Sequence, residues 1–164
     1  MKKLFLFSLI LVQFQIVFAQ TDSLPEYRKN PGIPSFTINK APDSTSFSHE
    51  QLAADKKIIL VVFSPDCGHC QVFVKHLLDS IQLFKNTQLV LASFIDYSHI
   101  RKFYEDQKIG EHKEIIMGRD ANYRLGSFYG VRQYPSAYVY DKKHIFLKKF
   151  ESHIPIHELA SDEK

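Results

Sequence analysis

The chain has 164 residues, of which 45% are hydrophobic and 24% are charged. This length and composition suit one domain with a substantial hydrophobic core, and no low-complexity tract or solenoid-length repeat interrupts it. The formal net charge of +3 falls to +1 without residues 1–19, because Lys2 and Lys3 leave and no acidic residue does. No block of Lys and Arg then remains, which argues against nucleic acid as a partner.

The first 19 residues have the pattern of a secretory signal peptide. Lys2 and Lys3 precede an apolar run at residues 4–12, and Ala19 ends a small-residue cleavage site before Gln20. The apolar run is shorter than a membrane span, although an uncleaved membrane anchor stays open as an alternative. We therefore expect an exported protein, soluble in the bacterial periplasm after cleavage, whose cysteines meet an oxidising compartment.

Residues 20–34 are polar and contain three prolines, so we predict a leader or linker there, followed by one domain at residues 35–164. The domain begins with a predicted short strand at residues 35–39. A short helix follows to about Asp55, with Ser48 and Gln51 forming a capping box at its start.

Residues 58–63 form a continuous apolar run rich in β-branched side chains, which is typical of a central parallel strand buried on both faces. Beyond this run, apolar side chains recur at steps of three and four residues, which predicts an amphipathic helix. These side chains are Cys70, Phe73, Val74, Leu77, Leu78, Ile81 and Phe84.

The rest of the chain continues to alternate strands with helices. We predict a strand at residues 88–95, and then a helix that Ser98 caps and Gly110 ends. A short strand or an extended segment is predicted at residues 114–117, and a helix from Asp120 to Gly130.

Residues 136–140 and 144–150 read as the two strands of a hairpin, and a short helix is predicted to begin near Pro155. Together with the preceding strands and helices, they predict an α/β fold in which helices flank a central mixed sheet.

The only two cysteines, Cys67 and Cys70, lie where the strand at 58–63 gives way to the helix. Cys67 is thereby placed at the helix N-terminus, where free N–H groups and the macrodipole stabilise a thiolate. This predicts that Cys67 attacks a substrate disulfide and that Cys70, one turn on, attacks the mixed disulfide and releases the product. Gly68 permits close approach, and a protonated His69 would favour the thiolate of Cys67.

These motifs resemble those of the thioredoxin superfamily. The stretch "PDCGHC" is similar to the "PWCGHC" of protein disulfide isomerase, and the order of elements resembles that of exported TlpA-like thiol-disulfide reductases. The segment "DANYRLGSFYGVRQYPSAYVYD" is similar to the one that carries the family's cis-proline. The resemblance covers residues 35–159 and implies a thioredoxin-like fold.

The resemblance also implies roles for individual residues. Cys67 would be the nucleophile, Cys70 the resolving thiol and Pro135 the cis-proline that faces them, while the backbone of Tyr134 would meet an extended substrate. The substrates would be protein thiols and disulfides, the electrons would come from a membrane donor, and no cofactor beyond the redox-active pair would be needed.

The chain departs from the family pattern at two positions. Asp66 precedes Cys67 where these families usually have tryptophan, and Val61 stands where thioredoxins often bury an acid. The carboxylate of Asp66 would disfavour the Cys67 thiolate, by repulsion or by capping the helix, and so make the protein more reducing. A solvent-exposed and screened Asp66 is the alternative, and the proton acceptor for Cys70 stays open.

Other functions remain open from the sequence. The Cys-Gly-His-Cys loop resembles that of an isomerase, so a disulfide oxidant or isomerase is the alternative to the reductase that the TlpA-like layout favours. A metal-carrying or binding module of the same fold is a third reading, but two thiols without a second cysteine pair favour no metal site. A purely structural disulfide is disfavoured because so short a loop adds less stability than a longer one would.

Overall fold

The structure, a computed structural model, describes residues 24–161. The predicted signal peptide at residues 1–19 lies outside the described part. The helices are α2 (Glu26–Lys29), α3 (Gly68–Asp79), α4 (Tyr97–Asp106), α5 (Arg124–Tyr129) and α6 (Ile156–Ala160). The strands are β1 (Thr37–Lys40), β2 (Ser46–Ser48), β3 (Lys57–Val62), β4 (Thr87–Ser93), β5 (Ile115–Arg119), β6 (Ser136–Tyr140) and β7 (Phe146–Glu151). Short 3-10 turns are η1 (His49–Gln51), η2 (Ile81–Phe84) and η3 (Ile109–Glu111).

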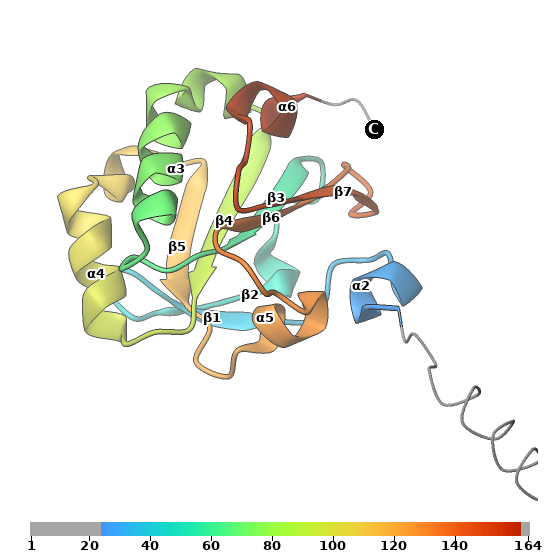
Figure 1. The fold of residues 1–164 in the computed structure, drawn as a ribbon, viewed down its shortest axis with the longest axis horizontal. Helices are drawn as coiled ribbons and strands as arrows, with labels where there is room; N and C mark the ends of the chain where they lie inside the picture. Colours follow the sequence, from blue (N-terminus) through green and yellow to red (C-terminus); the bar gives the residue numbers. More distant parts are fainter. Residues whose placement is uncertain (1–23, 162–164) are drawn as a thin grey trace, which may run out of the picture.

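The seven strands form one mixed sheet in the order β2-β1-β5-β4-β3-β6-β7 (Figure 1). β3, β4 and β5 run parallel, whereas β6 and β7 on one side and β1 and β2 on the other add antiparallel pairs. The predicted α/β fold with a mixed sheet is therefore confirmed. β3 lies in the interior of the sheet between β4 and β6, and all six of its residues are buried, as its apolar run predicted.

Each face of the sheet carries its own hydrophobic cluster. Successive strand residues point to opposite faces, so Ile59 and Val61 of β3 join one cluster while Ile58 and Leu60 join the other. The first cluster packs α3, α4 and α6 on the sheet, and the second packs α2 and α5 on the opposite face (Figure 1). Both cysteines lie on the α3 side.

The N-terminal segment expected as a leader is packed against the domain where the structure describes it. Tyr27 of α2 is only 2% exposed, and its ring contacts those of Tyr129, Tyr138 and Phe146. The amide of Phe146 also donates to the carbonyl of Pro31 at 2.8 Å. Tyr27 and Ile33 thus join this segment to the second hydrophobic cluster, which the polar composition of the segment did not suggest.

Two predicted helix starts differ from the observed ones by a few residues. The cap of α4 is Asp96, whose Oδ1 accepts from the amide of Ser98 at 2.9 Å, so Ser98 lies inside the first turn rather than at the cap. α5 begins only at Arg124, although the Asp120 carboxylate still binds its start by accepting from the amides of Arg124 and Leu125. Aspartate accepts such bonds from several positions before a helix, which is why sequence alone misplaces the start.

Two further elements are shorter than predicted. The helix expected from Ser48 to Asp55 is the single turn η1, because the chain becomes extended at Leu52, whose side chain enters the core. Gly110 does not end α4, which stops at Asp106; it lies in η3 instead. Gly130 does end α5 and adopts a left-handed φ of +61°, as a C-terminal glycine often does.

Candidate active site

Cys67 is the N-cap residue of α3, directly after the loop that leaves β3. Its side chain is partly exposed and makes no capping bond to the helix that follows. The thiol instead donates to the backbone carbonyl of Tyr134, with Sγ and O 3.9 Å apart. The helix N-terminus therefore leaves the sulfur accessible to a substrate.

Cys70 lies one turn later and is fully buried on the inner side of α3. Burial is the largest influence on its thiol and raises the pKa to about 12; the Ser64 amide, which donates to Sγ at 3.5 Å, acts in the opposite direction. The neighbouring Cys67 raises the pKa of Cys70 further through a side-chain hydrogen bond and its charge. The two thiols thus differ: one is open to solvent and the other is held protonated in the core.

Tyr134, followed by Pro135 in the loop before β6, contacts Cys67 through its backbone carbonyl. The Tyr134–Pro135 peptide bond is cis, as is Ala41–Pro42. The Tyr134 carbonyl contacts Cys67, and burial, followed by the hydrogen bond with Tyr123, raises the pKa of the Tyr134 phenol. The loop that the resemblance assigned to the substrate thus lies beside the predicted nucleophile, 67 residues away in sequence.

Asp66 has a partner that sequence reasoning missed. Its two carboxylate oxygens lie 3.2 and 3.0 Å from Nδ1 of His99 on α4, and both side chains are exposed. The bonds recorded for the carboxylate go to this ring and not to the N-terminus of α3. Asp66 therefore does not cap α3, and an effect of its charge on Cys67 stays a prediction beside the alternative of an exposed and screened carboxylate.

The two residues between the cysteines, Gly68 and His69, open α3 and are exposed. A Cβ atom at Gly68 would meet no heavy atom within 4 Å. Close approach at this position would therefore concern a substrate rather than the protein itself. The imidazole of His69 stands at the same exposed helix end as Cys67.

An aromatic cluster beside the cysteines was also missed from sequence. Phe94, directly after β4, contacts Tyr123 with ring centroids 5.0 Å apart and Tyr134 at 6.1 Å. The hydroxyls of Tyr123 and Tyr134 lie 3.1 Å apart. Phe94 lies one residue before the end of the predicted strand at residues 88–95, and no sequence pattern distinguished its exposed ring from the buried residues of that run.

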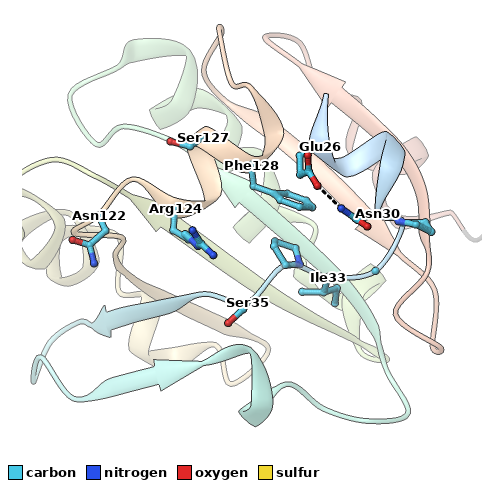
Figure 2. A pocket seen from close by; sticks show the side chains of 11 residues that line it. Glu26, Asn30, Ile33, Ser35, Asn122, Arg124, Ser127 and Phe128 are labelled. Carbon is cyan, nitrogen blue, oxygen red and sulfur yellow. Dashed lines mark hydrogen bonds between the residues drawn. The ribbon is translucent and has the colours of Figure 1, made fainter. Parts of the chain in front are cut away.

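A separate pocket lies on the opposite side of the sheet, between the N-terminal segment and α5. Figure 2 shows Arg124 and Phe128 of α5 facing Ile33, with Glu26 bound to Asn30 at the pocket rim. None of the predicted site residues lines this pocket. Within residues 24–161, no group of three or more His, Cys, Asp or Glu side chains is placed to hold a metal ion, and no helix is long and apolar enough to cross a membrane.

The fold is shared with thiol-disulfide oxidoreductases of known structure. A secreted disulfide oxidoreductase of Mycobacterium tuberculosis, homologous to E. coli DsbE, has a TM-score of 0.63 at 16% identity over 76% of this chain and 91% of that chain. The thioredoxin domain of a thiol-disulfide oxidoreductase from Bacteroides vulgatus gives a TM-score of 0.63 at 15% identity, covering 79% of this chain and 90% of that chain.

The same fold appears in other redox chemistry, since a thiol peroxidase from Chromobacterium violaceum has a TM-score of 0.60 at 12% identity, with 73% of each chain covered. At such identities the likeness shows the fold alone, and it confirms the thioredoxin-like fold. No protein-family model and no curated protein matches the sequence.

Proposed function

We propose that this protein is an exported thiol-disulfide oxidoreductase that reduces disulfides in other proteins with the Cys67–Cys70 pair. The observation that supports this most is the asymmetry of the two thiols: Cys67 is accessible at the N-terminus of α3, and Cys70 is buried beside it. A nucleophile has to meet the substrate, whereas a resolving thiol has only to meet the nucleophile. The placement of Tyr134 beside Cys67 adds a backbone surface for the substrate.

In the first step, the thiolate of Cys67 attacks one sulfur of the client disulfide. A bond forms between the Cys67 sulfur and that client sulfur, the client S–S bond breaks, and the second client sulfur leaves as a thiolate that takes up a proton. The N–H groups and dipole at the start of α3 favour the negative charge of the attacking sulfur.

In the second step, Cys70 loses its proton and attacks the Cys67 sulfur of the mixed disulfide. The Cys67–Cys70 bond forms, the bond to the client breaks, and the remaining client sulfur leaves as a thiolate and is protonated. Counted from the dithiol form, whose Cys67 proton leaves before the first step, the pair loses two electrons and two protons and the client gains them. Because burial keeps Cys70 protonated, the loss of its proton is the demanding part of this step.

Another turnover requires a dithiol reductant that returns two electrons and two protons to the Cys67–Cys70 disulfide. In an exported protein this donor would be a membrane protein that passes electrons outward. Run in reverse, the same chemistry would oxidise clients, which is the alternative that the Cys-Gly-His-Cys loop favours. The ratio of the two forms at equilibrium with glutathione separates these directions.

Trapping of mixed disulfides tests the proposed roles of the two thiols. We expect Cys70→Ser to accumulate disulfide-linked complexes with client proteins, because the first step still occurs and the second cannot. Cys67→Ser is the matched control and should accumulate none, since Cys70 is buried. The complexes are counted on non-reducing gels after affinity capture.

Equal trapping by both variants would contradict the assigned order of attack. If Cys70→Ser traps no client and the wild-type protein does not reduce insulin, the proposed oxidoreductase activity is contradicted. The alternative of a binding module would then be favoured.

A further inference from the structure

Phe94 is a large apolar side chain that remains 40% exposed at the end of a buried strand. β3 and β4 run parallel, with Val62 opposite Ala92, so the loops that follow them leave the same edge of the sheet. Cys67 lies in the loop after β3, and Phe94 begins the loop after β4. The exposed ring thus stands at the edge where the substrate has to arrive.

Two tyrosines hold this ring in place. Tyr123 meets Phe94 edge-on, with an angle of 73° between the ring planes and 5.0 Å between centroids. Tyr134 packs against the same ring at 6.1 Å. Edge-to-face and tilted pairs at these separations are the favourable geometries for aromatic rings.

The tyrosines are themselves fixed by their surroundings. Their hydroxyls lie 3.1 Å apart, and the Tyr123 hydroxyl also donates to the carbonyl of Val131 at 3.4 Å. Gly126 leaves room for the Tyr123 ring, since a Cβ atom there would lie 2.0 Å from it. The three rings therefore form a preorganised surface, and binding to it costs little ordering of the protein.

This surface is continuous with the reacting sulfur. Tyr134 contributes its ring to the cluster and its carbonyl to Cys67, 3.9 Å from Sγ. A client sulfur that reacts with Cys67 has to lie within bonding distance of Sγ, so the residues next to the client cysteine pass close to Tyr134. Neighbouring side chains on one face of an extended peptide lie about 7 Å apart, so a client chain that passes Tyr134 has a side chain within this spacing of the partly exposed Phe94 beside it.

We propose, on the basis of the function given above, that Phe94, Tyr123 and Tyr134 form a subsite that binds an aromatic side chain of the client within two residues of its reacting cysteine. The preferred substrates are thus disulfides flanked by Phe, Tyr or Trp. The rings provide an edge and a face for stacking, and the exposed part of Phe94 gains burial when the client side chain covers it.

The test uses symmetric disulfide dimers of short peptides, each with one cysteine and with Phe or Ala at the positions one and two residues before or after it. The rate of reduction by the dithiol form of the protein is measured for each dimer, with oxidised glutathione as a reference disulfide that has no aromatic group. For the wild type we expect at least one Phe position to raise the rate about fivefold over its Ala counterpart.

Phe94→Ala should lower this Phe-to-Ala ratio to near one, and Phe94→Tyr should retain it because the ring remains. Leu83→Ala is the matched control: Leu83 is 41% exposed in η2, beyond the far end of α3, and its variant should keep the wild-type ratio. Thermal unfolding of each variant establishes that it is folded.

The outcomes separate the subsite from the chemistry. If the wild type reduces glutathione and both peptide sets at one common rate, or if Phe94→Ala keeps the full Phe-to-Ala ratio, the subsite is wrong while the proposed function stands. If the wild type reduces none of these disulfides, the proposed function fails and the subsite fails with it.

Discussion

Two cysteines of identical chemistry, three positions apart, occupy opposite environments in this protein. Cys67 contacts the Tyr134 carbonyl at the surface, whereas Cys70 is enclosed by the cluster between α3 and the sheet. Solvation favours the charged form of a thiol and burial opposes it. The proposed roles of Cys67 as the nucleophile and Cys70 as the resolving thiol rest on this difference in exposure.

The buried state of Cys70 predicts a strong pH dependence of the second step. Burial is the largest cause of the raised pKa of Cys70, and it remains after Cys67 has joined a mixed disulfide, so only a small, pH-dependent fraction of Cys70 is thiolate near neutrality. With the Cys67–glutathione mixed disulfide as starting material, we expect the release of glutathione to accelerate about tenfold per pH unit between about pH 6 and about pH 8. Stopped-flow detection of released glutathione measures this rate.

Cys70→Ser provides the blank for that experiment, because no internal release can occur. A rate that is independent of pH over this interval would mean that a neighbouring group accepts the proton of Cys70. Val61 of β3 is buried and has no carboxylate to do so.

The pair formed by Asp66 and His99 predicts opposite effects of two substitutions. Asp66 places a negative charge one residue before Cys67, and His99, when protonated, neutralises it at 3.0 Å. Asp66→Asn should favour the thiolate and make the redox potential less negative, whereas His99→Ala should leave the carboxylate uncompensated and make it more negative. Because both side chains are exposed, each shift should be small, on the order of 10–20 mV.

Equilibration with glutathione measures both potentials, at low ionic strength so that screening is weak. Lys102→Ala on the same helix is a suitable control, since Lys102 pairs with Asp106 rather than with Asp66. Equal redox potentials in the wild type and the three variants would mean that Asp66 does not influence the redox potential of the Cys67–Cys70 pair.

At the scale of elements, the residues of the candidate site lie at the ends of strands and in the loops that connect them. Cys67 lies in the loop after β3, Tyr134 lies in the loop before β6, and Phe94 directly follows β4. β3 pairs with both β4 and β6, so one central strand fixes the relative positions of all three. The outer strands β1 and β2 extend the sheet beyond β5, and β7 extends it beyond β6.

The junction between β1 and β5 depends on a close backbone approach. A Cβ atom at Gly118 would lie 2.5 Å from the carbonyl oxygen of Asn39, which is backbone and cannot move aside cheaply. We expect Gly118→Ala to lower the free energy of unfolding by about 3 kcal/mol, since the two strands have to separate locally. Denaturant unfolding followed by circular dichroism measures the loss.

Gly32→Ala is the control for this prediction, because a Cβ atom there meets nothing within 4 Å and the residue has no left-handed φ. Its unfolding free energy should stay within about 0.5 kcal/mol of the wild type. Equal stability of the two alanine variants would mean that β1 is not held against β5 as described.

At the scale of the whole molecule, the two faces of the sheet are covered by different groups of buried side chains. The face under α3 and α4 contains the buried thiol, whereas the opposite face contains stacked tyrosines that hold the N-terminal segment. Tyr129 and Tyr138 stack at 3.6 Å, and Tyr27 closes over them. Tyr27 thus contributes to the stability of the domain on the face opposite to that of Cys70.

The proposed direction of electron flow predicts how redox state affects global stability. Closing the short Cys67–Cys70 loop restricts the unfolded chain, and the buried Cys70 thiol offers no stabilised thiolate that would favour the dithiol form. We expect the oxidised protein to exceed the reduced one by about 2 kcal/mol in the free energy of unfolding. Paired guanidinium titrations with and without a reductant measure the difference.

Cys70→Ser should show no such difference, because it cannot form the disulfide. A reduced form more stable than the oxidised form would identify the protein as an oxidant of clients and reverse the proposed direction.

The sequence by itself predicted most of the strands and helices, although not their exact bounds, and singled out Cys67 and Cys70 as the proposed redox pair. The apolar run at residues 58–63 and the periodic stripe that follows it specify a buried strand and an amphipathic helix, because local periodicity is set by which side chains must face the core. The spacing of Cys67 and Cys70 within that strand–helix junction then indicates the chemistry. These features depend on neighbours within a few residues along the chain.

Only the tertiary structure decided which residues surround that pair. His99 reaches Asp66 across 33 residues, the Tyr134 carbonyl reaches Cys67 across 67, and Phe94 meets Tyr123 from a different loop. Each contact joins the ends of separate elements, and their positions follow from how the sheet orders its strands and how the helices pack on it. No local pattern records that order, since residues brought together by folding need no common spacing in the sequence.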